Sequence, residues 1–197
     1  MPKSGMEPLR RKAMIDATIV EIGTAGTLDI TVSQIARRAG MSSALAHYYF
    51  GSKDQIFLAA MRQILEVFRL EVKAQVSLAT SPSERIRAVI NASFASYQFK
   101  HEVVAAWLTF YVRALHSTEV RRLLQVYARR LHSNLLFNLR QIFDAPTAEK
   151  VAQGLAAMID GFYIRHALQD LAPARQDVCV LVTDYLDLWL ERQAGHA

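Results

Sequence analysis

The sequence predicts an all-α protein of about nine helices, and three observations support this fold class. Apolar residues recur at helical spacing through almost the whole chain. The 197 residues include only five prolines and eight glycines, which leaves little room for long irregular segments. No stretch alternates apolar and polar residues as a half-buried strand does.

Composition limits the class of protein further. The chain is 52% hydrophobic and 21% charged, enough for one large domain or for a small and a medium one. Its formal charge of +5 is compatible with a nucleic-acid partner. The single cysteine, Cys179, cannot form an internal disulfide, and the first eleven residues are polar and basic. No stretch reaches 18 uncharged apolar residues. We therefore expect a cytoplasmic protein with no membrane partner.

The first helix is expected to follow a loose basic arm of about six residues. It begins at Glu7-Pro8, since proline suits the first helical turn, and ends around Gly23 and Gly26. Cationic side chains cluster near its start at Arg10, Arg11 and Lys12. These groups either contact phosphates or form a solvated face, and the sequence leaves both interpretations open.

Residues 31–53 predict a helix-turn-helix. Thr31 and Gln34 fit a capping box, and Gly40 falls where the first short helix must end. Ser42 suits the N-cap of a second helix that continues to about Tyr49. That helix has small, polar residues at its start and bulky ones at its end. This arrangement is typical of a helix that enters the major groove by its N-terminus.

The later helices have recognisable starts. Ser52 with Gln55 predicts a long linking helix over about 52–79, and Ser81-Pro82-Ser83-Glu84 predicts the next start. Further helices are expected to begin near His101 and after Ser117. The last two are expected over about 146–170, opened by Asp144 and Pro146, and about 173–193, opened by Pro173.

The last two helices are apolar on more than one face. Such helices need cover on both sides. A second copy of the chain is the simplest cover, so the sequence predicts a homodimer through about 146–170 and 173–193. Complete burial within the chain's own domain is the alternative.

Several runs of residues resemble a known family. The run Thr31, Ile35, Ala36, Ala39, Gly40, Met41, Ser42, Phe50, Lys53 and Ile56 resembles the DNA-binding signature of TetR-family transcriptional regulators. Further runs resemble the BetI branch of that family: Met1-Pro2-Lys3, Gly5-Met6, residues 35–40, His47-Tyr48-Tyr49-Phe50, Ala106-Trp107-Leu108, Arg129-Arg130-Leu131, Ser133-Asn134-Leu135 and residues 154–161. Together they span nearly the whole chain.

The resemblance implies two functional domains. Residues 1–53 would be the DNA-binding domain and 54–197 the ligand-binding and dimerisation domain. The chain would be a repressor of glycine betaine synthesis genes that is relieved by a small cation such as choline. The alternative within the family is a repressor of an efflux or catabolic operon with another ligand. A role as activator also stays open.

The resemblance also implies roles in binding a pseudo-palindromic operator. Ser43, Ala44 and Leu45 would lie nearest the base edges, where Leu45 could contact a thymine methyl or instead pack in the core. The other expected contacts, mostly to phosphate, are Thr31, Ser33, Ser42, His47, Tyr48 and Lys53. Tyr49 and Phe50 are expected to pack the motif together. The family often has glycine at position 44, tyrosine at 47 and histidine at 49, so its operator sequence does not transfer.

An effector such as choline would be held by aromatic faces through cation–π attraction, with a carboxylate nearby. From the aromatic residues of the body we select Trp107, Tyr111 and Phe162 as walls. Ordinary core packing is the alternative for each. Glu102, Asp160 and Asp170 are possible counter-charges, and the sequence does not choose among them.

Nothing in the sequence predicts catalysis. None of the six histidines has a partner at a metal-ligand spacing, and no nucleophile or phosphate-binding motif occurs. Cys179 is expected to pack in an apolar helix. We therefore expect no catalytic residue, metal or cofactor. A helical enzyme or a small-molecule carrier without DNA binding is the minority alternative.

Overall fold

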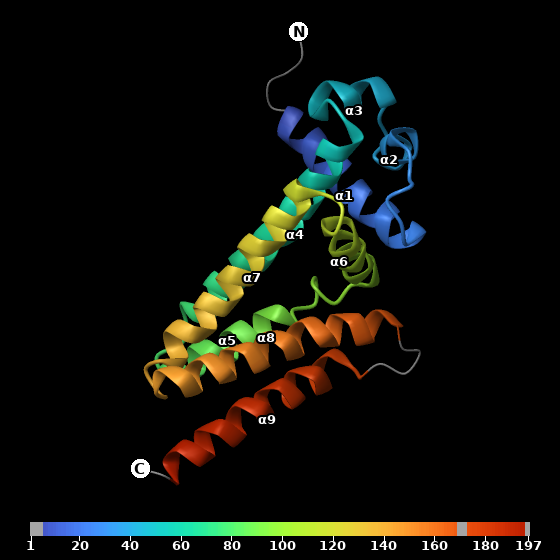
Figure 1. The fold of residues 1–197 in the computed structure, drawn as a ribbon. Helices are drawn as coiled ribbons and strands as arrows, with labels where there is room; N and C mark the ends of the chain where they lie inside the picture. Colours follow the sequence, from blue (N-terminus) through green and yellow to red (C-terminus); the bar gives the residue numbers. More distant parts are fainter. Residues whose placement is uncertain (1–5, 169–172, 196–197) are drawn as a thin grey trace. The chain divides into compact units, whose positions relative to one another are not determined.

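The computed structural model describes residues 6–168 and 173–195, and every regular element in these ranges is a helix. The all-α prediction with about nine helices is confirmed for this part of the chain. The helices are α1 (Glu7–Ala25), α2 (Val32–Arg38), α3 (Ser43–Phe50), α4 (Lys53–Val76), α5 (Pro82–Ser93), α6 (His101–Ala114), α7 (Thr118–Leu139), α8 (Ala145–Leu168) and α9 (Arg175–Ala194) (Figure 1).

Two of the three predicted capping boxes form completely, while at the start of α4 the Ser52 hydroxyl accepts from the Gln55 N–H at 3.3 Å. The Thr31 hydroxyl accepts from the Gln34 N–H at 3.1 Å, and the Gln34 side chain accepts from the Thr31 N–H at 2.6 Å. Ser81 and Glu84 make the same reciprocal pair at the start of α5. Each box satisfies backbone donors that the first turn leaves free, so short polar signals fix where these helices begin.

Two helix ends differ slightly from expectation. Helix α9 begins at Arg175 and not at the expected Pro173, because Ala174 has an extended backbone and forms the N-cap. Helix α4 ends at Val76, and Leu78 beyond it is 84% exposed, so no burial favours a further turn. The expected end of the eighth helix at Asp170 and most of the expected N-terminal arm lie outside the described residues.

The chain forms two compact units. The first contains residues up to Glu66 together with Lys100–Arg121, and the second contains Val67–Phe99 together with the chain from Arg122 onward. Helix α6 therefore packs with the N-terminal helices, although it lies far along the chain. These units describe packing alone, and the functional division near residue 53 stays a prediction.

The first unit is held together by a close approach of α1 and α6. Gly23 is buried in α1, and a Cβ atom at this position would collide with the backbone of Glu102 in α6. Only glycine permits this helix spacing. Helix α2 is tied to α1 by an ion pair between Arg38 and Glu21 at 2.6 Å. These contacts fix the framework that carries the helix-turn-helix.

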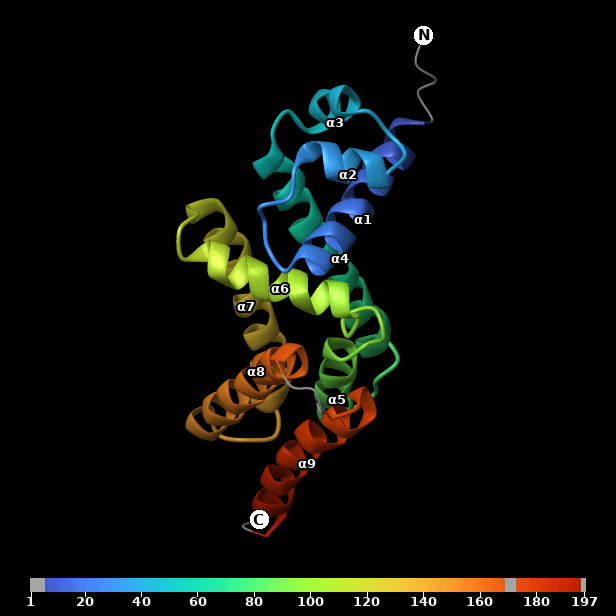
Figure 2. The ribbon, with the colours of Figure 1, turned by 90° about the vertical axis from the view of Figure 1, so that its right-hand side faces the viewer.

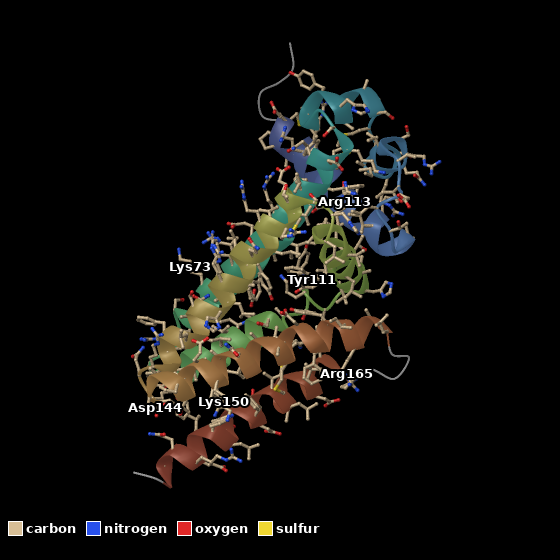
Figure 3. The ribbon with its side chains drawn as sticks, viewed as in Figure 1. Lys73, Tyr111, Arg113, Asp144, Lys150 and Arg165 are labelled. Carbon is tan, nitrogen blue, oxygen red and sulfur yellow. The ribbon has the colours of Figure 1, made fainter. Side chains whose placement is uncertain are left out.

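The second unit packs α5, α8 and α9 with parts of α4 and α7. Helices α5, α8 and α9 appear together in the lower part of Figure 2. The buried Tyr163 hydroxyl of α8 donates to the Ser93 carbonyl of α5, and Arg87 of α5 pairs with Asp187 of α9. Helices α8 and α9 approach closely, since a side chain at Gly154 would collide with the Tyr185 ring. Lys150 of α8 (Figure 3) also contacts α9, since its ammonium lies 5.3 Å from the centroid of the Trp189 ring.

Candidate nucleic-acid interface

Helices α2 and α3 form a helix-turn-helix. The turn passes through Gly40, whose φ of +67° favours glycine. The Ser42 hydroxyl then caps α3 by accepting from the Leu45 N–H at 3.2 Å. Buried Ile35 and Ala46, both 0% exposed, fill the inner side of the pair. The opposite side carries the polar residues predicted to contact DNA.

The predicted base-reading residues gather at the N-terminus of α3. Ala44 is exposed, while Ser43 and Leu45 are half-buried. The Ser43 hydroxyl lies 3.0 Å from that of Ser33 on α2, so one hydrogen bond joins the two helices at this point. Leu45 keeps part of its surface in contact with solvent, which leaves its side chain available to a partner.

The predicted phosphate contacts lie around this group. Thr31 and Ser42 use their hydroxyls as helix caps and remain exposed. Tyr48 is 75% exposed, so most of its side chain is open to a partner. Lys53 is half-buried at the first residue of α4, with its ammonium 5.4 Å from the Phe57 ring centroid. Free N–H groups at a helix start also attract phosphate.

His47 is exposed near the end of α3, and its ring has a defined direction. Its Nδ1 lies 3.2 Å from the Gly51 carbonyl oxygen. A carbonyl oxygen can only accept, so Nδ1 carries the hydrogen of this bond. The other nitrogen, Nε2, is left for a further partner.

The end of α3 packs onto α1 through Arg11. The Arg11 guanidinium donates to the Tyr49 carbonyl and lies 4.6 Å from the Phe50 ring centroid. Phe50 is 8% exposed, which agrees with its predicted packing role. Lys12 is exposed and pairs with Asp16 at 2.5 Å. Of the three cations near the start of α1, Arg11 therefore has a structural role that the sequence analysis did not consider.

Arg37 is a candidate that the sequence analysis missed. It is exposed on α2 and follows Ser33 by four residues, so the two side chains share a helix face. Its neighbour Arg38 is occupied by Glu21. The spacing from Ser33 was the signal that would have identified Arg37 as a cation beside α3.

The predicted effector walls fall into two aromatic groups, one in each compact unit. Trp107 and Tyr111 stack on α6 in the first unit, with ring centroids 5.9 Å apart. Trp107 is 3% exposed and Tyr111 is half-buried. Phe162 of the second unit is half-buried and lies 6.3 Å from Phe94, centroid to centroid.

Phe162 belongs to a larger cluster than the sequence suggested. Phe99 lies 5.7 Å from Phe94 and 4.3 Å from the His166 ring, and Tyr163 lies 6.0 Å from Phe99. The sequence analysis selected neither Phe99 nor His166. The four-residue spacing of Phe162 and His166 was the only sequence signal for the second of these.

The candidate counter-charges are distributed in the same way. Glu102 is half-buried at the start of α6 in the first unit, and Asp160 is half-buried on α8 in the second. Asp170 lies outside the described residues.

Cys179 on α9 is half-buried, and burial raises the pKa of its thiol. A thiol held protonated is a weak nucleophile.

The described residues contain no group of three or more histidine, cysteine or acidic side chains that could hold a metal ion. In the same ranges, no helix combines the length and apolarity needed to cross a bilayer.

Comparisons with known proteins agree along nearly the whole chain. The family model for the C-terminal part of BetI-type transcriptional repressors matches residues 82–191, and the model for bacterial regulatory proteins of the tetR family matches residues 14–60. The HTH-type transcriptional regulator BetI of Brucella suis biovar 1 (strain 1330) is 52% identical over 193 residues, covering 98% of each chain. The regulator of the same name from Rhizobium meliloti (strain 1021) is 51% identical, covering 96% of this chain and 94% of its own.

Solved structures share the fold. A transcriptional regulator from Saccharomonospora viridis, crystallised in complex with choline, aligns with a TM-score of 0.80 at 20% identity, covering 90% of this chain and 95% of its own. A TetR transcription regulator from Haloarcula marismortui ATCC 43049 aligns with a TM-score of 0.80 at 22% identity, covering 91% and 97%. The chain therefore belongs to the TetR family, in its BetI-type branch, and is a DNA-binding transcriptional repressor rather than an enzyme.

Proposed function

We propose that this repressor controls glycine betaine synthesis genes and that choline, or a closely related quaternary ammonium, relieves its DNA binding. The observation that carries the proposal is the match to BetI regulators over 98% of the chain. The choline bound to the Saccharomonospora viridis regulator adds support for the ligand class.

The DNA-binding part of the proposal rests on α3. Its N-terminal residues Ser43, Ala44 and Leu45 enter the major groove and contact base edges, while Ser33 supports them from α2. Thr31, Ser42, His47, Tyr48 and Lys53 bind the backbone on either side. Because this set offers few hydrogen-bonding groups to bases, much of the sequence preference comes from DNA shape and from the spacing of two heads.

The effector part of the proposal rests on aromatic faces. A quaternary ammonium cannot donate an N–H hydrogen bond, so cation–π attraction and a carboxylate hold it. The candidates are the stacked Trp107 and Tyr111, with Glu102 in the same unit, and separately Phe162 with Asp160 in the other. Substituting Trp107 and Phe162 one at a time by leucine distinguishes the two groups through their choline affinities.

The active species in this proposal is a homodimer through α8 and α9. Large apolar side chains remain exposed on these two helices: Ile164 at 44%, Leu168 at 73%, Val180 at 56%, Leu181 at 46% and Leu188 at 57%. Covering them with the same face of a second copy gives a two-fold dimer. Such a dimer presents two α3 helices to half-sites about 34–36 Å apart on a pseudo-palindrome.

Relief of repression follows from reciprocity. If choline lowers the affinity for DNA, bound DNA must lower the affinity for choline by the same factor. Helix α4 is a direct covalent route for this coupling, since it is one continuous helix with residues in both compact units.

Fluorescence anisotropy of labelled duplexes from the DNA upstream of the chain's own gene tests the proposal. Specific binding should weaken steeply with salt and should be reduced by millimolar choline. Binding that is unaffected by choline would refute the choline effector. A thermal-shift screen with choline, betaine, betaine aldehyde and multidrug cations then identifies the ligand class that stabilises the protein.

A further inference from the structure

We propose that His47 binds DNA only in its doubly protonated, cationic form, so that operator binding takes up protons at each head. This inference rests on the proposed operator contacts of α3. It adds to them a dependence of affinity on pH that originates in one residue.

The argument begins with the ring orientation. Nδ1 of His47 is committed to the Gly51 carbonyl, 3.2 Å away, and must carry a hydrogen there. A neutral imidazole has only one hydrogen, so Nε2 of the neutral ring is an acceptor with a lone pair. Phosphate oxygens are acceptors too. A neutral His47 therefore presents the wrong group to a phosphate, while the cationic ring donates from Nε2 and keeps its bond to Gly51.

The position of Gly51 keeps the ring in this orientation. Gly51 follows the last residue of α3 with a φ of +76°, and its N–H donates to the His47 carbonyl at 2.8 Å. The side chain and the backbone of His47 are thus both bonded to the same residue. A neutral ring that presented an Nε2–H would have to give up the hydrogen on Nδ1, and this would break the side-chain bond to Gly51. Protonation provides the second donor without that loss.

The charged side chains on adjoining segments include Arg11 of α1, which donates to the Tyr49 carbonyl, and Lys53 and Asp54 at the start of α4. Tyr48 and Tyr49 add two phenols beside His47 in the chain. Histidine is the side chain type whose charge ordinarily changes between pH 5 and 8. A pH effect in this range that depends on position 47 therefore reports the imidazole.

The test measures operator affinity by anisotropy at constant ionic strength between about pH 6 and pH 8. Because binding favours the protonated ring, affinity should fall as pH rises, by about tenfold or more over this range for two heads. His47→Gln offers a phosphate donor that does not titrate and should bind with little pH dependence. His47→Asn can keep the bond to Gly51 but cannot reach the phosphate, so it should bind weakly at every pH.

His116→Gln is the matched control, because His116 is exposed in the same compact unit but lies beyond α6. It should retain the full pH dependence of the unsubstituted chain. Equal pH slopes for the unsubstituted chain and His47→Gln would overturn the inference while leaving operator binding intact. Absence of operator binding at every pH would overturn the proposed DNA contacts as well.

Discussion

The hydroxyl oxygens of Ser33 and Ser43 lie 3.0 Å apart, which joins α2 to the first turn of α3 where the motif is proposed to meet base edges. One of the two hydroxyls donates to the other, so the pair has a single remaining donor for DNA.

Substituting these serines tests whether the pair acts as a unit. Ser33→Ala and Ser43→Ala should each weaken operator binding by about 1 kcal/mol, since each removes a hydrogen bond at the interface. The double variant should lose less than the sum, with a coupling of about 0.5 kcal/mol or more. Anisotropy titrations of the four proteins measure this cycle. Strict additivity would show that the two hydroxyls act independently. Urea unfolding should change by less than about 0.5 kcal/mol, as is usual for surface positions.

Gly23→Ala tests the close approach of α1 and α6. The added methyl group meets the backbone of Glu102, which cannot rotate away as a flexible side chain would. We expect a loss of about 3 kcal/mol in the free energy of unfolding, the upper part of the usual range for overpacked sites. Thr24→Ala, at the exposed next position of the same helix, is the control and should be nearly neutral. Equal stabilities of the two variants by urea denaturation would contradict this geometry.

The capping box at Glu84 predicts a pH-dependent contribution to stability. Hydrogen bonds from the Thr80 hydroxyl, the Thr80 N–H and the Ser81 N–H lower the pKa of Glu84 below its ordinary value of 4.5. A lowered carboxyl pKa means that the contribution is complete above pH 4.5 and is lost as pH falls through the folded-state value. Glu84→Gln should therefore be less stable than the unsubstituted chain at neutral pH. The difference should shrink in acid, as followed by thermal unfolding monitored by circular dichroism. A difference that grows in acid would reverse the assigned sign.

Ile164→Glu tests the proposed dimer. Ile164 is 44% exposed on α8, so a charge there should leave the subunit folded but disfavour its burial against a second copy. We expect analytical ultracentrifugation to show monomers, and operator affinity to fall sharply because a single head binds one half-site. Leu115→Glu places the same charge at a leucine that is 68% exposed beyond α6, and it should remain dimeric. Dissociation of both variants, or of neither, would argue against an α8–α9 interface.

The parts of the fold that depend on neighbours in sequence were predictable. Thr31 with Gln34 and Ser81 with Glu84 are local signals, and the helices begin where these signals stand. The packing of α6 on α1 was not predictable, because it depends on the missing side chain of Gly23 meeting a residue far along the chain. For the same reason, periodicity identified buried aromatic residues without indicating their partners. Phe162 proved to join Phe94, Phe99 and His166 in one cluster, with ring contacts that no local pattern encodes.

The candidate interface also has side-chain contacts that local sequence patterns do not predict. His47 was selected because the motif resembles a known DNA-binding signature. Arg37 was missed, although its four-residue spacing from Ser33 places both side chains on one face of α2. The direction of the His47 ring depends on the backbone of Gly51 after α3 has formed. Arg11 could be noted as a cation from sequence, but its position over Phe50 requires the fold.

The division of the first compact unit between two separate stretches of chain affects how the protein is made. Residues up to Glu66 leave the ribosome well before α6, which completes this unit. Until then, the face of α1 around Gly23 has no partner and is open to water or to other nascent chains. The first compact unit can therefore be complete only after translation has passed residue 121. A fragment that ends after the motif would keep its helix caps but would lack α6, which packs on α1. Such a fragment should be more prone to aggregate than the full chain.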